Sequence, residues 1–125
     1  MLIQLALITA AFAADTPKAA ELTIPKAQFV DGMKTGLPGA FCADNSYFRK
    51  CFGTAKEECT KQVTADSQPC LDKFAAEMPA QFHQPADGQT WGEKVGNCVG
   101  GKFEEAFGKK KVKSAECEDL TKWKP

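Results

Sequence analysis

The chain has 125 residues, the length of one domain, and its 16 Lys and Arg residues balance its 16 Asp and Glu residues. Because the net charge is zero, electrostatics give no reason to expect nucleic acid or an anionic membrane as a partner. Six cysteines without a Cys-x-x-Cys pair predict three disulfides in an oxidising compartment and no structural metal site.

The chain begins with an apolar stretch that is too short to cross a membrane. This stretch ends in the small-x-small pattern Ala11-Phe12-Ala13, so we expect residues 1–13 to be a signal peptide and the mature protein to be periplasmic or secreted. No Lys or Arg precedes it, which is consistent with a truncated start, and a buried N-terminal helix is the alternative. Residues 14–22 are polar and rich in alanine and are predicted to form a flexible arm.

Residues 23–125 are predicted to be a single all-α domain of four or five helices, cross-linked by three disulfides. The first helix should be capped near Thr23 and end near Gly36. A second, shorter helix should follow a cap at Asp44 or Asn45 and end at Gly53. Its apolar positions are Tyr47, Phe48, Cys51 and Phe52. The connection to the next helix is so short that the two must be close neighbours.

The longest predicted helix spans residues 54–78, and we expect the other helices to pack on it. Thr54 and Glu57 form a capping box at its start, whereas Pro69 predicts either a kink or a break into two helices. Its apolar positions recur at helical spacing on one face. They are Cys59, Val63, Cys70, Phe74 and Met78.

A loop with two prolines, residues 79–89, precedes a helix predicted over residues 90–107. Thr90 and Glu93 form the capping box of this helix. Its apolar stripe consists of Trp91, Val95, Cys98, Val99 and Phe103. A notch of small residues beside its apolar stripe should receive a neighbouring helix of the same chain, with a dimer contact as the alternative. The residues of the notch are Gly92, Gly96 and Gly100.

A lysine-rich stretch, residues 109–113, connects this helix to a last short helix capped by Ser114, whose apolar positions are Cys117, Leu120 and Trp123. The lysines could contact a polyanion or an acidic partner. Acidic residues on both sides offset their charge, so a solvated connector is the simpler interpretation. No stretch of the chain predicts a β-strand.

The positions of the cysteines along these helices favour one disulfide pairing. In a continuous helix, Cys59 and Cys70 would lie about 16 Å apart along the axis and could not bond each other. A tight turn after the second helix would instead bring Cys51 to Cys59. The expected pairs are Cys42–Cys70, Cys51–Cys59 and Cys98–Cys117, and the alternative links Cys42 to Cys98 and Cys70 to Cys117.

Nested disulfides across a helical hairpin, here between Cys42 and Cys70, resemble the plan of the twin Cys-x9-Cys proteins of the mitochondrial intermembrane space. The spacings in this chain are eight and ten residues instead of nine, and a further cysteine pair follows. The resemblance implies a disulfide-locked hairpin and carries no function.

Few residues qualify as candidates for a functional site. His83, the only histidine, lies near Asp87 and could serve as a general base or a metal ligand, but a solvated loop histidine is the simpler interpretation. No catalytic residue, metal site or cofactor is predicted, because no motif of that kind is present. A binding surface is expected where aromatic and basic side chains reach solvent. Its candidate residues are Phe82, His83, Trp91, Lys109, Lys110 and Lys111.

The sequence therefore favours binding over catalysis. We expect an exported, non-catalytic domain that engages another protein, of the inhibitor, immunity or accessory type, and that has no stable membrane anchor. The nine phenylalanines also fit a small carrier of apolar ligands, which is the alternative, and an enzyme that uses His83 comes third.

Overall fold

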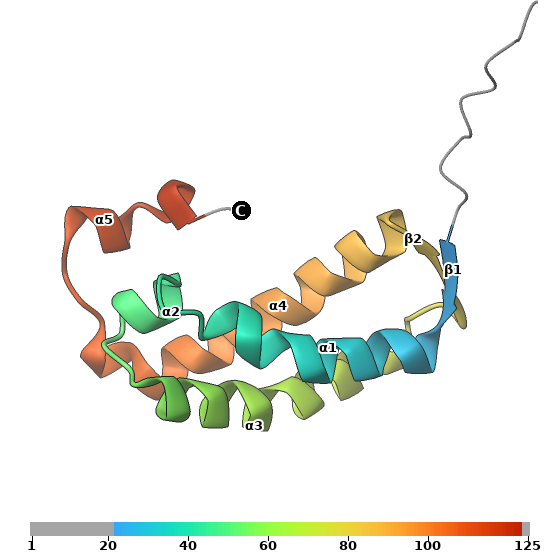
Figure 1. The fold of residues 1–125 in the computed structure, drawn as a ribbon, viewed down its shortest axis with the longest axis horizontal. Helices are drawn as coiled ribbons and strands as arrows, with labels where there is room; N and C mark the ends of the chain where they lie inside the picture. Colours follow the sequence, from blue (N-terminus) through green and yellow to red (C-terminus); the bar gives the residue numbers. More distant parts are fainter. Residues whose placement is uncertain (1–21, 124–125) are drawn as a thin grey trace, which may run out of the picture.

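The computed structural model describes residues 22–123, so the predicted signal peptide and all but the last residue of the predicted arm lie outside the described residues. Three long helices form a bundle: α1 (Lys26–Phe41), α3 (Lys56–Ala75) and α4 (Ala86–Phe107). Helix α3 packs against both other helices, whereas α1 and α4 approach each other at few places. Figure 1 shows a small sheet at one end of this bundle and the C-terminal segment beside the other end.

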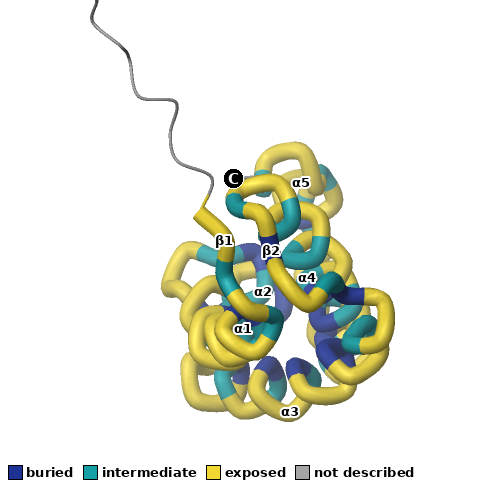
Figure 2. The backbone as a smooth tube through the Cα atoms, turned by 90° about the vertical axis from the view of Figure 1, so that its right-hand side faces the viewer, coloured by how far each residue is buried: buried dark blue, intermediate teal, exposed yellow. Residues whose placement is uncertain are grey.

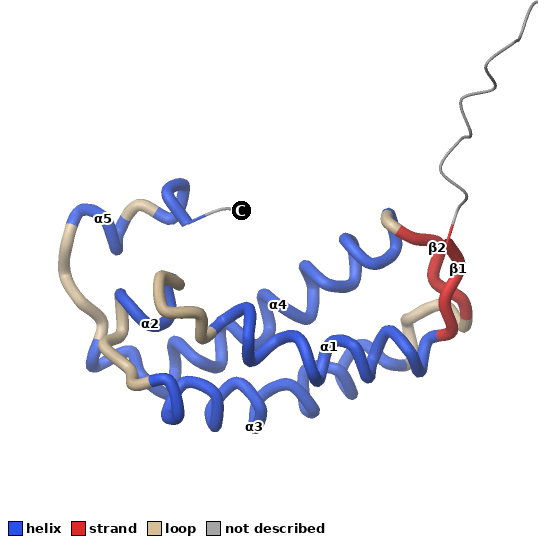
Figure 3. Tube along the Cα trace, viewed as in Figure 1, coloured by secondary structure: helices blue, strands red, loops and turns tan. Residues whose placement is uncertain are grey.

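The remaining elements of the described chain are short (Figure 3). Helix α2 (Tyr47–Lys50) follows α1, and helix α5 (Ala115–Glu118) follows α4. Two 3-10 turns complete the C-terminal part, η1 (Gly108–Lys110) and η2 (Leu120–Trp123). The all-α class, with five helices and three disulfides, is confirmed.

The prolines inside the long helices do not end them. Helix α1 continues past Gly36 and Pro38 to Phe41, so the predicted end near Gly36 is wrong. Helix α3 runs without a break through Pro69, which selects the single-helix alternative. A proline inside a helix removes one backbone hydrogen bond. The burial of Leu37 on the inner face of α1 and of Cys70 on the inner face of α3 offsets that loss.

The serine caps form, but the predicted capping boxes do not. At the start of α2, Ser46 instead of the predicted Asp44 or Asn45 accepts the capping hydrogen bond from the Arg49 N–H, whereas Ser114 caps α5 as predicted. Helix α3 begins two residues after Thr54, whose hydroxyl donates to the carbonyl of Phe48 instead. Helix α4 begins four residues before Thr90, which therefore lies inside it.

Two four-residue strands form a sheet that the sequence did not predict. Strand β1 (Leu22–Pro25) pairs antiparallel with β2 (Gln81–Gln84), and Ile24 lies opposite Phe82. Phe82 is fully buried, and its ring stacks on Phe29 of α1 with a centroid distance of 4.3 Å. Strands this short show no clear alternation of apolar and polar residues, so the sequence did not predict them. The pairing between distant segments and the burial of Phe82 stabilise the sheet.

The core lies where the three long helices face one another. Figure 2 shows the buried residues along the inner sides of these helices. Cys59, Val63 and Cys70 of the predicted α3 stripe are fully buried, while Phe74 is half-buried near the end of the helix. Val95, Val99 and Phe103 form the matching face of α4. The helical periodicity therefore identified the core faces of both helices correctly.

The disulfide pairing differs from both predicted sets. Helix α2 is too short to build a hairpin with α3, so Cys51 at its end bonds to Cys117 of α5. The end of α1 lies beside the first turns of α3, which joins Cys42 to Cys59. The remaining pair, Cys70–Cys98, links the C-terminal part of α3 to the middle of α4. The expected pairs Cys42–Cys70, Cys51–Cys59 and Cys98–Cys117 are wrong, and the resemblance to nested bridges does not hold.

Candidate functional site

The structure does not bring the predicted surface residues together. Phe82 is fully buried, so it cannot belong to a binding surface. His83 is exposed on β2, where its backbone N–H donates to the carboxylate of Asp87 at 2.7 Å. Trp91 is half-buried on α4, edge-on to Phe74 and beneath the ammonium of Lys94.

The predicted lysines lie at the opposite end of the bundle from the sheet (Figure 1). Lys109, Lys110 and Lys111 are all exposed. Lys110 forms an ion pair with Glu58 of α3 at 2.9 Å and lies over the ring of Phe107. These lysines therefore share no surface with His83 or Trp91. The binding surface expected from the sequence is split between the two ends of the bundle.

A different surface gathers aromatic side chains, three of which are only half-buried. The end of α1, helix α2 and the C-terminal turn enclose two adjoining hollows of about 700 and about 470 Å³, both open to solvent. Both hollows are lined by the same four aromatic residues. We call this surface the aromatic groove and define it by Phe41, Tyr47, Phe48, Leu120 and Trp123.

The rings of the aromatic groove contact one another in a chain. Phe41 stacks on Phe48 with centroids 4.5 Å apart, and Tyr47 lies edge-on to Phe48 at 5.2 Å. Tyr47 in turn contacts Trp123 at 5.6 Å. Polar groups lie at the rim, where the Tyr47 hydroxyl donates to the carboxylate of Glu104 at 3.3 Å. The groove thus combines an apolar wall with a polar edge, the composition typical of a recognition site.

One predicted notch glycine forms the floor of this groove. A Cβ at Gly100 would lie 3.3 Å from the ring of Phe48, so this position must be small for the ring to approach α4. No atom lies within 4 Å of a Cβ built at Gly92 or Gly96. The notch therefore receives rings from the neighbouring helices α1 and α2 at Gly100 but not at Gly92 or Gly96, so the predicted helix contact forms at a single position.

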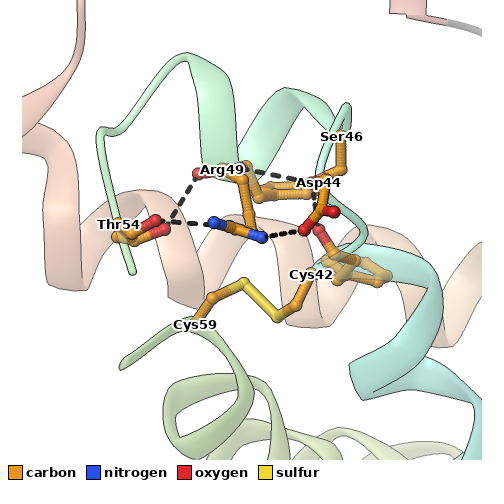
Figure 4. A network of polar contacts seen from close by, with 8 residues as sticks. Cys42, Asp44, Ser46, Arg49, Thr54 and Cys59 are labelled. Carbon is orange, nitrogen blue, oxygen red and sulfur yellow. Dashed lines mark hydrogen bonds and ion pairs between the residues drawn. A yellow bond between two sulfur atoms is a disulfide. The ribbon is translucent and has the colours of Figure 1, made fainter. Parts of the chain in front are cut away.

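Polar contacts hold helix α2, which carries two of the groove residues (Figure 4). Arg49, the only arginine of the chain, pairs with Asp44 and donates from Nε to the carbonyl of Thr54. The Ser46 hydroxyl donates to the carbonyl of Phe41 at the end of α1. Gly53 makes the turn out of α2 with a φ of +58°, a conformation that favours glycine. Together with the adjacent Cys42–Cys59 disulfide, these contacts fix the orientation of Tyr47 and Phe48.

The other wall of the groove is the C-terminal strap, which we define as residues 114–123. Its covalent link to the bundle is the Cys51–Cys117 disulfide, and its ring contact is Trp123 on Tyr47. Within the strap, the Trp123 indole N–H donates to the carbonyl of Glu116 at 2.9 Å. Leu120 remains 57% exposed at the mouth of the groove, which leaves an apolar side chain available to a partner.

Asp119 orders the turn that presents Leu120 and Trp123. Its carboxylate accepts hydrogen bonds from the side chain and the backbone of Thr121, and these bonds lower the pKa of Asp119 below the ordinary aspartate value. Because the pKa of Asp119 is lowered in the folded state, the ionised carboxylate stabilises the fold at pH values above the ordinary aspartate pKa. This contribution to the free energy of unfolding is lost as the pH falls through the pKa of the folded state.

Replacing Thr121 by valine is expected to raise the pKa of Asp119 toward the ordinary value, because the stronger of the two bonds is removed. The measurement is the pH titration of the Asp119 carboxyl carbon by NMR in the wild type and the variant. Thr35→Val is the matched control, because the Thr35 hydroxyl donates to a backbone carbonyl on α1. An unchanged midpoint in Thr121→Val would contradict the assigned bond.

The rest of the described chain offers few other candidates for a functional site. Across residues 22–123, no three His, Cys, Asp or Glu side chains are grouped so that they could hold a metal ion. No helix in the same range has the length and apolar character needed to cross a membrane. A further hollow of about 410 Å³ lies beside the Cys42–Cys59 disulfide, with Asp44 and Lys56 at its rim.

Sequence patterns did not reveal the aromatic groove, because Tyr47, Phe48 and Trp123 occupy apolar positions of the predicted short helices. One signal was present. Tyr47 and Phe48 are adjacent in sequence, and adjacent side chains on a helix point in different directions, so they cannot both face the core. Tyr47 is buried, whereas Phe48 is left partly exposed.

Comparison with known proteins gives one match. The model of the family described as "T2SS substrate NttA" matches residues 23–120, which includes every described helix and all six cysteines. No curated protein and no solved structure matches the chain.

Proposed function

The chain belongs to the NttA family of T2SS (type II secretion system) substrates, and from this premise we propose that it acts, once secreted, as a non-catalytic domain that binds another protein through the aromatic groove. Family membership makes it an exported protein that is secreted by way of the periplasm. Three disulfides agree with that route, since such bonds form and persist in oxidising compartments. Its signal peptide over residues 1–13 stays a prediction.

The observation that carries this proposal is the row of partly exposed rings on a rigid support. Phe41, Phe48 and Trp123 are each half-buried, so apolar ring area faces solvent across the groove. Aromatic side chains held in this way lose little conformational entropy when a partner covers them, which is why they dominate binding energy at interfaces. Disulfides at both walls, Cys42–Cys59 and Cys51–Cys117, keep the rings in place before binding.

A carrier of apolar ligands remains the second candidate, because the volume of the larger hollow falls in the range of small-molecule sites. The hollow is open to solvent, whereas carriers usually enclose most of the surface of their ligand. An enzyme that uses His83 is third, since His83 lines none of the three hollows described above. Both alternatives make predictions that differ from protein binding.

Peptides selected against the oxidised chain from a phage-displayed library are expected to carry aromatic or leucine side chains and to bind at the groove. Replacing Trp123 by alanine should then weaken their binding by about tenfold or more, because a central aromatic contact is lost. Dissociation constants from calorimetry and amide shifts of Phe48 and Gly100 in NMR spectra provide the measurement.

Trp91→Ala is the matched control, since Trp91 is equally half-buried and lies outside both groove hollows. It should leave peptide affinity unchanged. Selected peptides that bind Trp123→Ala and wild type equally would contradict the proposal. Binding of dodecanoate at the same amides, with no peptide recovered, would favour the carrier instead.

A further inference from the structure

The lysine-rich connector between η1 and α5 is the most accessible stretch of basic residues in the described chain. Lys109, Lys110, Lys111 and Lys113 are all exposed, and Val112 among them is 43% exposed. Residues 111–113 belong to no helix or strand. The backbone is extended at Lys111, with φ −59° and ψ 125°, and at Ser114, with φ −137° and ψ 157°. Exposed, irregular segments are preferred sites of proteolytic cleavage.

Few contacts restrain this connector. The Val112 N–H donates to the carbonyl of Cys51 at 2.7 Å, and the Lys111 N–H donates to Gly108 at 3.2 Å. The Lys110–Glu58 ion pair is exposed at both partners, and pairs of this kind contribute little stability. Within residues 22–123, the ammonium groups of Lys111 and Lys113 make no hydrogen bond or ion pair. Local opening of the connector therefore breaks two backbone hydrogen bonds and a weak ion pair.

Most other lysines of the described chain are part of a long helix. Examples on the three long helices are Lys34, Lys61, Lys73 and Lys94. A protease can bind these positions only after a helix turn has opened, and α3 and α4 are joined by the Cys70–Cys98 disulfide. Lys50 ends the short helix α2 directly before disulfide-bonded Cys51, and Lys122 lies so close to the chain end that cleavage there would remove only three residues.

From this contrast we propose that the connector is a cleavage site for a serine protease that cuts after lysine, and that the Cys51–Cys117 disulfide keeps the cut segment attached. Water adds across the Lys111–Val112 or Lys113–Ser114 peptide bond and leaves a carboxylate on the lysine and an ammonium on the next residue. Cys117 lies beyond both bonds, and its partner Cys51 is fully buried. The product is a disulfide-linked two-chain protein. This inference does not depend on the function proposed for the groove.

The test is limited digestion by trypsin of the oxidised full-length chain, in which Lys18 of the predicted flexible arm is replaced by glutamine in every variant. Intact masses are recorded before and after reduction. The first product should be one water heavier than the protein before reduction. After reduction it should release a C-terminal peptide that begins at Val112 or Ser114. A first product that has already lost this peptide without reductant, or a first cut inside α1, α3 or α4, would overturn the proposal.

Two variants with the same change of charge separate the connector from lysines in general. In that Lys18→Gln background, replacing all four connector lysines by glutamine should slow the first cleavage by about tenfold or more, because most remaining lysines of the described chain lie on helices that must open first. The substitutions are Lys109→Gln, Lys110→Gln, Lys111→Gln and Lys113→Gln. The control set, Lys34→Gln, Lys61→Gln, Lys73→Gln and Lys94→Gln, should leave the rate unchanged, and equal slowing in both sets would also overturn the proposal.

Discussion

Replacing Phe103 by alanine is expected to lower the free energy of unfolding by about 4 kcal/mol. The Phe103 side chain is fully buried, and its ring centroid lies 5.0 Å from that of Phe48 and 5.5 Å from that of Phe52. Truncation leaves a cavity that these rings cannot fill without losing their own contacts. Urea unfolding of the oxidised protein, followed by circular dichroism, measures the change if the m-value is unaltered.

Phe107→Ala is the control for this prediction. Phe107 lies one turn further along α4, contacts Phe103 at 4.8 Å and is only partly buried. Because much of this ring already faces water, its removal should cost about half as much. If Phe103→Ala costs under about 1 kcal/mol, Phe103 is not the packing centre that its burial implies.

Removing the Cys70–Cys98 disulfide by a double alanine substitution is expected to lower the free energy of unfolding by about 3.5 kcal/mol. The two cysteines are 28 residues apart, so the bond excludes many conformations of the unfolded chain. In the folded state it joins the C-terminal part of α3 to the middle of α4. We expect both helices to stay ordered in its absence, because Val63, Val95 and Val99 pack in the core independently of the bond. Thermal unfolding and urea unfolding of the double variant test this value.

The Cys51→Ala/Cys117→Ala double variant provides a comparison for the stability loss of the Cys70–Cys98 variant. That pair spans 66 residues, so loop length alone would give it the larger effect. However, this disulfide joins only the C-terminal strap to the bundle. Without the bond, the strap gains conformational entropy in the folded state as well as in the unfolded state, so the difference between the two states changes less. We therefore expect a smaller loss of stability than for Cys70–Cys98. The opposite order would show that the strap contributes to the core.

Helical periodicity identified the core of this protein without reference to tertiary structure. The spacing of Cys59, Val63 and Cys70 predicted the buried face of α3, and the spacing of Val95, Val99 and Phe103 predicted that of α4. Periodicity succeeds because a helix side that faces a neighbour must be apolar at every turn. The even cysteine count likewise indicated an oxidising location, which membership of a T2SS substrate family supports.

Local signals failed where a distant contact decided the outcome. Thr54 and Thr90 each precede a glutamate at capping-box spacing, yet both helices begin elsewhere because packing selects the helix start. Phe82 was placed in an exposed loop, but pairing with β1 and stacking on Phe29 bury it. Neither Ile24 nor Phe29 is near Phe82 in sequence. A local sequence pattern around Phe82 therefore could not predict its burial.

The amino-acid sequence determined that this chain is an exported, all-α domain with six paired sulfurs, because composition and helical spacing are properties that each segment carries by itself. Only the tertiary structure decided which sulfurs bond, that residues 22–25 join a sheet, and that Phe41, Phe48 and Trp123 share one groove. Each of these depends on how close separate elements lie in space. That closeness follows from the packing of α1, α3 and α4 as a whole, which no single segment encodes.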